Sequence, residues 1–106
     1  NATPPPAPSG EVSGPVAELA AVNIEFSTDA LSAPADTAFT IHFKNDDAAG
    51  VLHNVEIKDA AGASLFKGEL IDGGQEINYA VPALAAGSYS FVCTVHPNMT
   101  GTLTVQ

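Results

Sequence analysis

Residues 89–105 read YSFVCTVHPNMTGTLTV, and this stretch contains both the pattern that decides the fold and the side chains able to carry chemistry. Tyr89, Phe91 and Cys93 stand at every second position, which is the period of a β-strand with one face turned towards a core. From residue 100 onward the chain reads TGTLTVQ, in which threonine and the single valine are typical of strands. The stretch therefore predicts two strands joined by a short loop.

The same period of two recurs through most of the remaining chain. Apolar side chains alternate in four further runs, namely Val22, Ile24 and Phe26; Phe39, Ile41 and Phe43; Val55 and Ile57; and Ile77, Tyr79 and Val81. Between them lie sequences typical of turns, namely NDD at 45–47, DAAG at 59–62, DGG at 72–74, Pro82 and AG at 86–87. Roughly six to eight short strands at this spacing predict an all-β fold, a Greek-key antiparallel β-sandwich or barrel.

The N-terminal part of the chain departs from this pattern. Residues 1–14, NATPPPAPSGEVSG, contain four prolines and two glycines with almost nothing to bury, which predicts a flexible linker or tail. Residues 15–22, PVAELAAV, include good helix formers but run directly into NIEF, so they fit either a helix or a strand. We therefore expect a tail over 1–14 and one folded domain over 15–106.

The composition of the tail also bears on location. Linkers of this kind often connect a domain to a membrane anchor, so we hypothesise attachment through an N-terminal anchor that has been removed. The printed N-terminus shows no basic stretch followed by an apolar core, so we expect any export signal to have been removed as well. The expected location is extracytoplasmic, either the periplasm or the outer face of a membrane.

Charge and size limit the possible functions. Twelve acidic residues stand against three basic ones, giving a net charge of -9, so phosphate backbones and anionic membrane surfaces would repel the domain. We therefore expect that the domain does not bind nucleic acids and that its partner has a basic face. One small domain also leaves little room for a substrate cleft between two lobes, which favours a carrier over an enzyme.

Three donor side chains follow residue 91 in close succession. Cys93, His96 and Met99 stand at three-residue steps, and Cys93 shares the core face of its strand with Phe91. We expect the two later side chains to come from the loop beyond the strand, because a tight loop can turn all three donors towards one point. Thiolate, imidazole and thioether are soft or borderline donors suited to copper, whereas calcium and magnesium require oxygen ligands.

A trigonal copper site of this kind needs a second imidazole. His53 has the parity of Val55 and Ile57 and stands at the head of their strand, so we predict that it is the second histidine ligand. His42, by contrast, is out of phase with Ile41, so we expect it to face solvent and assign it no role.

The two motifs, HNV at 53–55 and CTVHPNM at 93–99, resemble the plastocyanin and amicyanin branch of the cupredoxins, the type 1 blue copper proteins. The short loop is most similar to amicyanin, whose C-T-x-H-P-x-M pattern is matched at every specified position. A proline usually follows the cysteine and threonine in amicyanin, and Val95 stands there in this chain. The resemblance covers roughly Val22 to Val105, and outside the motifs it depends on the strand pattern alone.

This resemblance implies roles for individual residues. One copper ion is expected to be held by four ligands, namely His53, Cys93, His96 and Met99. Asn54 resembles the residue that ties the two ligand loops together by hydrogen bonds, with Thr94 as its partner, and such bonds tune the reduction potential. His96 is implied to be the electron exit, with Pro97 and Asn98 beside it in a docking face. Asp46 and Asp47 are interpreted as turn formers that could add to an acidic patch near the copper.

The function implied is single-electron transport, without enzymatic activity, by a monomer whose redox partner is a protein with a basic face, such as a cytochrome. A cysteine-dependent enzyme with His96 or His53 as base is the first alternative, but it leaves Met99 unexplained. A copper-delivery or storage protein on the same fold remains open. A binuclear copper domain fails, because that site needs two cysteines and the chain has one.

Overall fold

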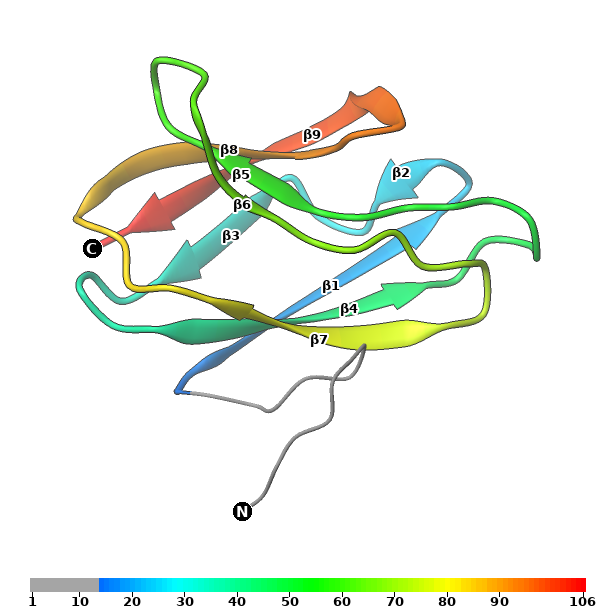
Figure 1. Ribbon diagram of the computed structural model, residues 1–106, viewed down its shortest axis with the longest axis horizontal. Helices are drawn as coiled ribbons and strands as arrows, with labels where there is room; N and C mark the ends of the chain where they lie inside the picture. Colours follow the sequence, from blue (N-terminus) through cyan, green and yellow to red (C-terminus); the bar gives the residue numbers. More distant parts are fainter. Residues whose placement is uncertain (1–13) are drawn as a thin grey trace.

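The computed structural model describes residues 14–106 as two β-sheets that pack against each other (Figure 1). Residues 1–13, nearly all of the predicted tail, lie outside the described residues. Within residues 14–106 there are nine strands and no helix, and thus no helix long and apolar enough to span a membrane. The strands are β1 (Val16–Val22), β2 (Glu25–Phe26), β3 (Ala30–Ala33), β4 (Phe39–Asn45), β5 (Glu56–Lys58), β6 (Ser64–Lys67), β7 (Glu76–Val81), β8 (Gly87–Cys93) and β9 (His96–Val105).

The strand order confirms the all-β sandwich, and the strand pairing is mainly antiparallel with two parallel exceptions. One sheet has the order β2-β1-β4-β7 and the other β3-β9-β8-β5-β6. Most strand pairs are antiparallel, as predicted, but β1 pairs with β4, and β3 with β9, in parallel. A parallel pair cannot be closed by a tight turn and is joined by a long stretch of chain. Alternating apolar residues carry no information on strand direction, so the sequence pattern could not show this.

The region from residue 15 to residue 26 resolves one open question and corrects one prediction. Residues 16–22 form strand β1, because pairing with β4 and burial of Leu19 and Ala21 outweigh the helical preference of this segment. The apolar run at 22–26, however, is not one strand. Asn23 and Ile24, with φ of 55° and 56°, form a two-residue turn between β1 and β2. Because this predicted strand is divided by a turn, the described residues contain nine strands, more than the six to eight that we predicted.

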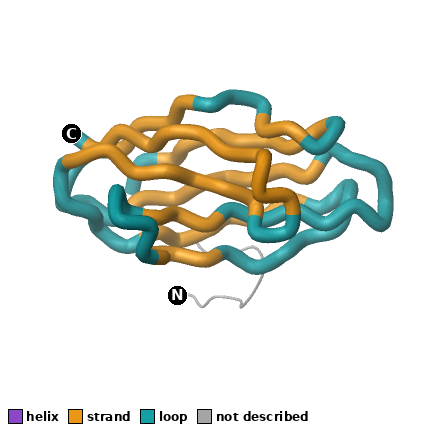
Figure 2. Tube along the Cα trace, turned by 90° about the horizontal axis from the view of Figure 1, so that it is seen from above, coloured by secondary structure: helices purple, strands orange, loops and turns teal. Residues whose placement is uncertain are grey.

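The core lies between the two sheets and is rich in aromatic rings. Phe26 of β2 contacts Phe91 of β8, with ring centroids 5.2 Å apart, and Phe43 of β4 stacks on Tyr79 of β7 at 5.8 Å. Phe43 and Phe91 are fully buried. Burying rings of this size contributes a large share of the stability of a small domain and holds the two sheets in a fixed relation. The loops gather at the two ends of the sandwich (Figure 2).

His42 of β4 lies on the outer face of its sheet, as predicted, but its contacts were not foreseen. Its Nδ1 lies 2.7 Å from Oε1 of Glu18, and its Nε2 lies 2.6 Å from Oε1 of Glu76. Both ring nitrogens therefore face carboxylates, an arrangement that suits the doubly protonated ring. The hydrogen bond to Glu18, aided by Glu76 and opposed by partial burial, raises the pKa of His42 above its ordinary value of 6.5.

This contact predicts a pH-dependent contribution to stability. A raised pKa means that the folded chain binds the His42 proton more tightly than the unfolded chain does, so the contribution is complete below pH 6.5 and is lost as pH rises through the folded-state pKa. Wild type and His42→Gln, compared by urea unfolding just below pH 6.5 and well above the raised pKa, should differ more at the lower pH. An equal difference at both would contradict the prediction.

Candidate metal centre

Three of the four predicted ligands meet at one end of the sandwich. Sγ of Cys93 lies 3.8 Å from Nδ1 of His53 and 3.6 Å from Nδ1 of His96. All three potential donor atoms are within 4.8 Å of one another. A trigonal ion with bonds of about 2.0 Å to nitrogen and about 2.3 Å to sulfur holds the sulfur about 3.7 Å from each nitrogen. The spacing and the donor types therefore fit a mononuclear copper site of the two-histidine, one-cysteine kind.

The segment that presents Cys93 and His96 is tighter than we predicted. We expected His96 in a loop, but Cys93 and His96 are paired across a two-residue turn at 94–95, and β9 already begins at His96. The next residue pair, Val92 with Thr100, is shifted in register, so three residues of β9, 97–99, have no partner on β8. We expected a loop to turn the donor side chains towards one point. The register shift has this effect instead, because residues 97–99 need not follow the geometry of a regular strand.

Met99 lies within the unpaired part of β9 and is 3% exposed. In a regular strand, residues three apart point to opposite faces, so His96 and Met99 could not both turn inward. The register shift between them allows both to do so. Beyond it, Leu103 and Val105 continue the buried face of β9 with the parity of Met99.

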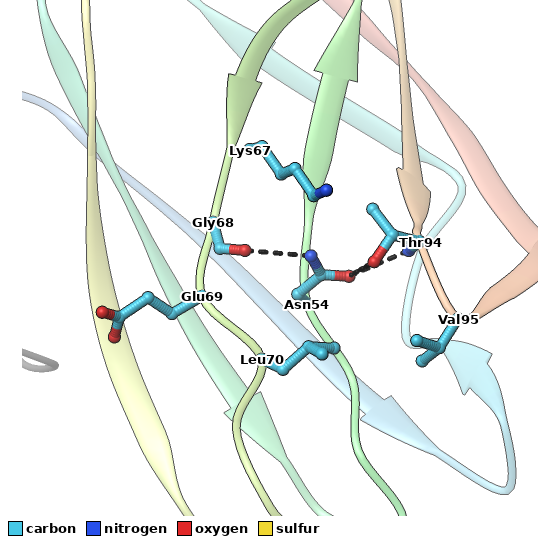
Figure 3. Close-up of a pocket in the computed structure, with 7 residues that line it drawn as sticks. All are labelled: Asn54, Lys67, Gly68, Glu69, Leu70, Thr94 and Val95. Carbon is cyan, nitrogen blue, oxygen red and sulfur yellow. Dashed lines mark hydrogen bonds between the residues drawn. The ribbon is translucent and has the colours of Figure 1, made fainter.

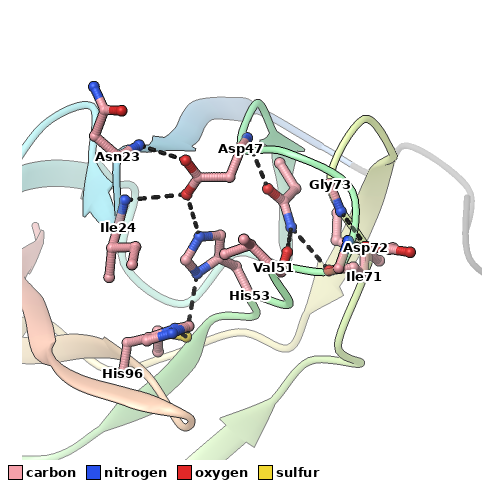
Figure 4. Close-up of polar contacts among 12 residues, drawn as sticks. Asn23, Ile24, Asp47, Val51, His53, Ile71, Asp72, Gly73 and His96 are labelled. Atoms are coloured by element: carbon pink, nitrogen blue, oxygen red, sulfur yellow. Dashed lines mark hydrogen bonds and ion pairs between the residues drawn. The ribbon is translucent and has the colours of Figure 1, made fainter.

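The backbone of His53 is fixed by hydrogen bonds that do not involve its side chain. Its N–H donates to the Ile71 carbonyl at 3.1 Å, and the Ile71 N–H donates back to the His53 carbonyl at 2.9 Å. This isolated bridge lies just ahead of β5 and leaves the His53 side chain fully buried. The ring centroids of His53 and His96 are 4.8 Å apart, and His53 lies between Asp47 and His96 (Figure 4).

Asp47, which we interpreted as a turn former that could add to an acidic patch near the copper, contacts a predicted ligand directly. Its Oδ2 lies 2.6 Å from Nε2 of His53, the ring nitrogen that faces away from Cys93, and its side chain is only 10% exposed. The backbone N–H groups of Asn23 and Ile24 also donate to this carboxylate. The bond from His53, together with those two amides, lowers the pKa of Asp47 despite partial burial. Aspartates in a turn give no sign of such a long-range contact.

Asn45 shapes the loop that carries Asp47. Its Nδ2 donates to the carbonyls of Val51 and Ile71, at 2.8 and 2.9 Å, and its Oδ1 accepts from the Asp47 N–H at 3.0 Å. Its side chain is fully buried. Because buried polar groups are costly unless paired, these bonds fix the path of the chain from β4 to His53.

The predicted contact between Asn54 and Thr94 is present. Oδ1 of Asn54 accepts from the backbone N–H of Thr94 at 2.9 Å and from its hydroxyl at 3.1 Å. Its Nδ2 donates to the Gly68 carbonyl at 2.9 Å, so this buried amide links three segments (Figure 3). The side chain therefore fixes the turn after Cys93 relative to the segment of His53.

The surface beside His96 is partly apolar. Val95 and Leu70 line one open pocket and are 46% and 43% exposed. Pro97 and Asn98, which follow His96, are exposed as well. The same pocket is also lined by the charged residues Lys67 and Glu69, so this surface is mixed in character.

Known structures with the same arrangement of strands include blue copper proteins. An auracyanin from Roseiflexus castenholzii is 21% identical, with a TM-score of 0.75, over 91% of this chain and 99% of that one. Auracyanin A from Chloroflexus aurantiacus, described as a "blue" copper protein, is 23% identical with a TM-score of 0.75, over 88% and 100%. A reduced amicyanin variant is 25% identical with a TM-score of 0.68, over 94% and 92%. No curated protein sequence matches the chain.

The fold and the donor cluster together are typical of one class of protein, the small β-sandwiches that bind copper. The family model of the cupredoxin-like domain matches residues 7–105, so the chain belongs to the cupredoxin-like family. The predicted membership of the cupredoxins is confirmed.

Proposed function

We propose that this protein is a type 1 blue copper electron carrier with one copper ion held by His53, Cys93, His96 and Met99. The observation that supports it most directly is the cluster of one sulfur and two Nδ1 atoms, with sulfur–nitrogen distances of 3.6 and 3.8 Å. The bound copper would supply a one-electron couple between its cuprous and cupric states. Family membership supports the same function.

The protein's contribution to electron transfer is a rigid set of donors. His53 and Cys93 are fully buried, and each is fixed by main-chain pairing, Cys93 to β9 and His53 to Ile71 through an isolated bridge. Donors that move little when the metal changes charge keep the barrier to electron transfer low. His96 is the least buried of the three clustered donors, so the electron would enter and leave through its ring. No bond to a substrate is made in this mechanism.

The test is the visible spectrum of the purified protein after addition of cupric ion. An intense blue or green thiolate-to-copper band is expected, at a stoichiometry of one copper per chain. A colourless protein that binds only cuprous ion would overturn the proposal and favour copper delivery instead.

The proposed partner is a redox protein with a basic face, such as a cytochrome, because the net charge of this chain is -9. The predicted consequence is a rate of electron transfer that falls as ionic strength rises, since salt screens the attraction between opposite charges. Stopped-flow mixing with a basic cytochrome over a range of salt concentrations measures this. A rate that is independent of salt, or that rises with it, would argue against an electrostatically guided encounter.

The proposed location is extracytoplasmic, with residues 1–14 acting as a tether to a membrane anchor. The proline-rich composition of these residues supports this proposal. The sequence of the unprocessed precursor tests it, and a precursor that lacks any export signal would exclude it.

A further inference from the structure

The far side of the His53 ring is occupied by a carboxylate. Nε2 of His53 lies 2.6 Å from Oδ2 of Asp47, while Nδ1 faces Cys93. Building on the proposed function, we propose that Asp47 is a positioning residue that fixes the tautomer and direction of the His53 ring and lowers the reduction potential of the copper. Asp47 would act through His53, without touching the metal.

The Asp47 carboxylate is also held by hydrogen bonds from two backbone amides of the β1–β2 turn. Oδ1 accepts from the Asn23 N–H at 2.6 Å and Oδ2 from the Ile24 N–H at 3.0 Å. Ile24 has a φ of 56°, a conformation that is strained for a β-branched residue and persists only where its surroundings enforce it. The carboxylate is thus clamped between two backbone amides and the imidazole, and it cannot turn away from the ring.

This contact selects one form of His53. A neutral imidazole carries its proton on either nitrogen, and an acceptor at Nε2 places the proton there. Nδ1 is then left with a free lone pair directed towards Cys93. Since the selection requires no metal, the ring should be ready to bind in the copper-free protein.

The same contact acts on the balance between the two copper charge states. A carboxylate hydrogen-bonded to a metal-bound imidazole makes that imidazole a stronger donor, and it also places a negative charge in a poorly solvated position. Both effects stabilise the cupric state more than the cuprous state. The reduction potential should therefore be lower than it would be with a neutral residue at position 47.

The variant Asp47→Asn tests this inference, with Asp46→Asn as its matched control. Asp46 is the adjacent residue, carries the same charge and is exposed, and its backbone N–H, not its side chain, makes the contact to Ala21. In Asp47→Asn the ratio of cuprous to cupric affinity should rise about tenfold, which corresponds to a potential about 59 mV higher. In Asp46→Asn the change should be several times smaller. Equal changes in both variants, or none in Asp47→Asn, would overturn the inference.

A second measurement does not depend on how Asp47→Asn folds. Nitrogen NMR of the copper-free wild type, recorded where the ring is neutral, should show the His53 proton on Nε2, with slow exchange of that proton. Protonation at Nδ1 would overturn the inference even if the copper protein were blue. Failure of the proposed function looks different, because the wild type would then form no thiolate-to-copper band whatever the state of the ring.

Discussion

Replacing Cys93 with serine is expected to abolish the intense visible absorption of the copper-loaded protein. Such a band requires transfer of charge from a thiolate to cupric ion, and Cys93 is the only cysteine in the chain. A hydroxyl at the same position is a harder and far less easily ionised donor, so two imidazoles would hold the metal with only weak absorption. The fold should survive, because serine fits the space of cysteine and its hydroxyl can donate to one of the two neighbouring imidazole nitrogens.

Visible spectra of Cys93→Ser and of Met99→Leu, recorded at equal copper loading, separate the roles of the two sulfur ligands. Met99→Leu keeps the thiolate and fills a similar buried volume, so it should retain a strong band with an altered position and a raised reduction potential. Far-ultraviolet circular dichroism of both copper-free variants controls for folding. If Cys93→Ser kept the band, the thiolate assignment would be wrong, and with it the proposed copper site.

The alternation of apolar side chains predicted which residues of a strand are buried, but it did not predict strand ends or strand direction. Phe39, Ile41 and Phe43 alternate in the sequence and all three are buried in β4. The alternation at 22–26 was misleading, because parity continues unchanged through a turn of two residues at Asn23 and Ile24. Strand direction was not predictable either. An apolar period of two is the same for parallel and antiparallel neighbours.

Some residues of the candidate site could likewise be predicted from the sequence, and one could not. Cys93 and His96 were recognisable because their donor types and spacing are rare together, and His53 because its parity directs it to the core. Asp47 was not recognisable. Its contact with His53 exists only because Asn45 folds the intervening loop back on itself, and asparagine and aspartate in that stretch look like ordinary turn residues.

Replacing Asn54 with alanine is expected to lower the free energy of unfolding of the copper-free protein by about 3 kcal/mol. The side chain is 1% exposed and makes three hydrogen bonds, two with Thr94 and one with the Gly68 carbonyl. Alanine leaves the Thr94 N–H and the Gly68 carbonyl without this partner, and each buried polar group that loses its partner costs about 1–3 kcal/mol. The small cavity left by the amide adds to this cost.

Urea unfolding without copper is the appropriate measurement, because a metal that binds only the folded chain would add its own stabilisation. Asn98→Ala is the matched control, since Asn98 is exposed and belongs to the same ligand segment, and its loss should be within about 0.5 kcal/mol. A loss below about 1 kcal/mol in Asn54→Ala would mean that water replaces the amide at low cost. Asn54 would then not be what holds the turn after Cys93 against the segment of His53, and the rigidity of the donor set would have to come from main-chain pairing alone.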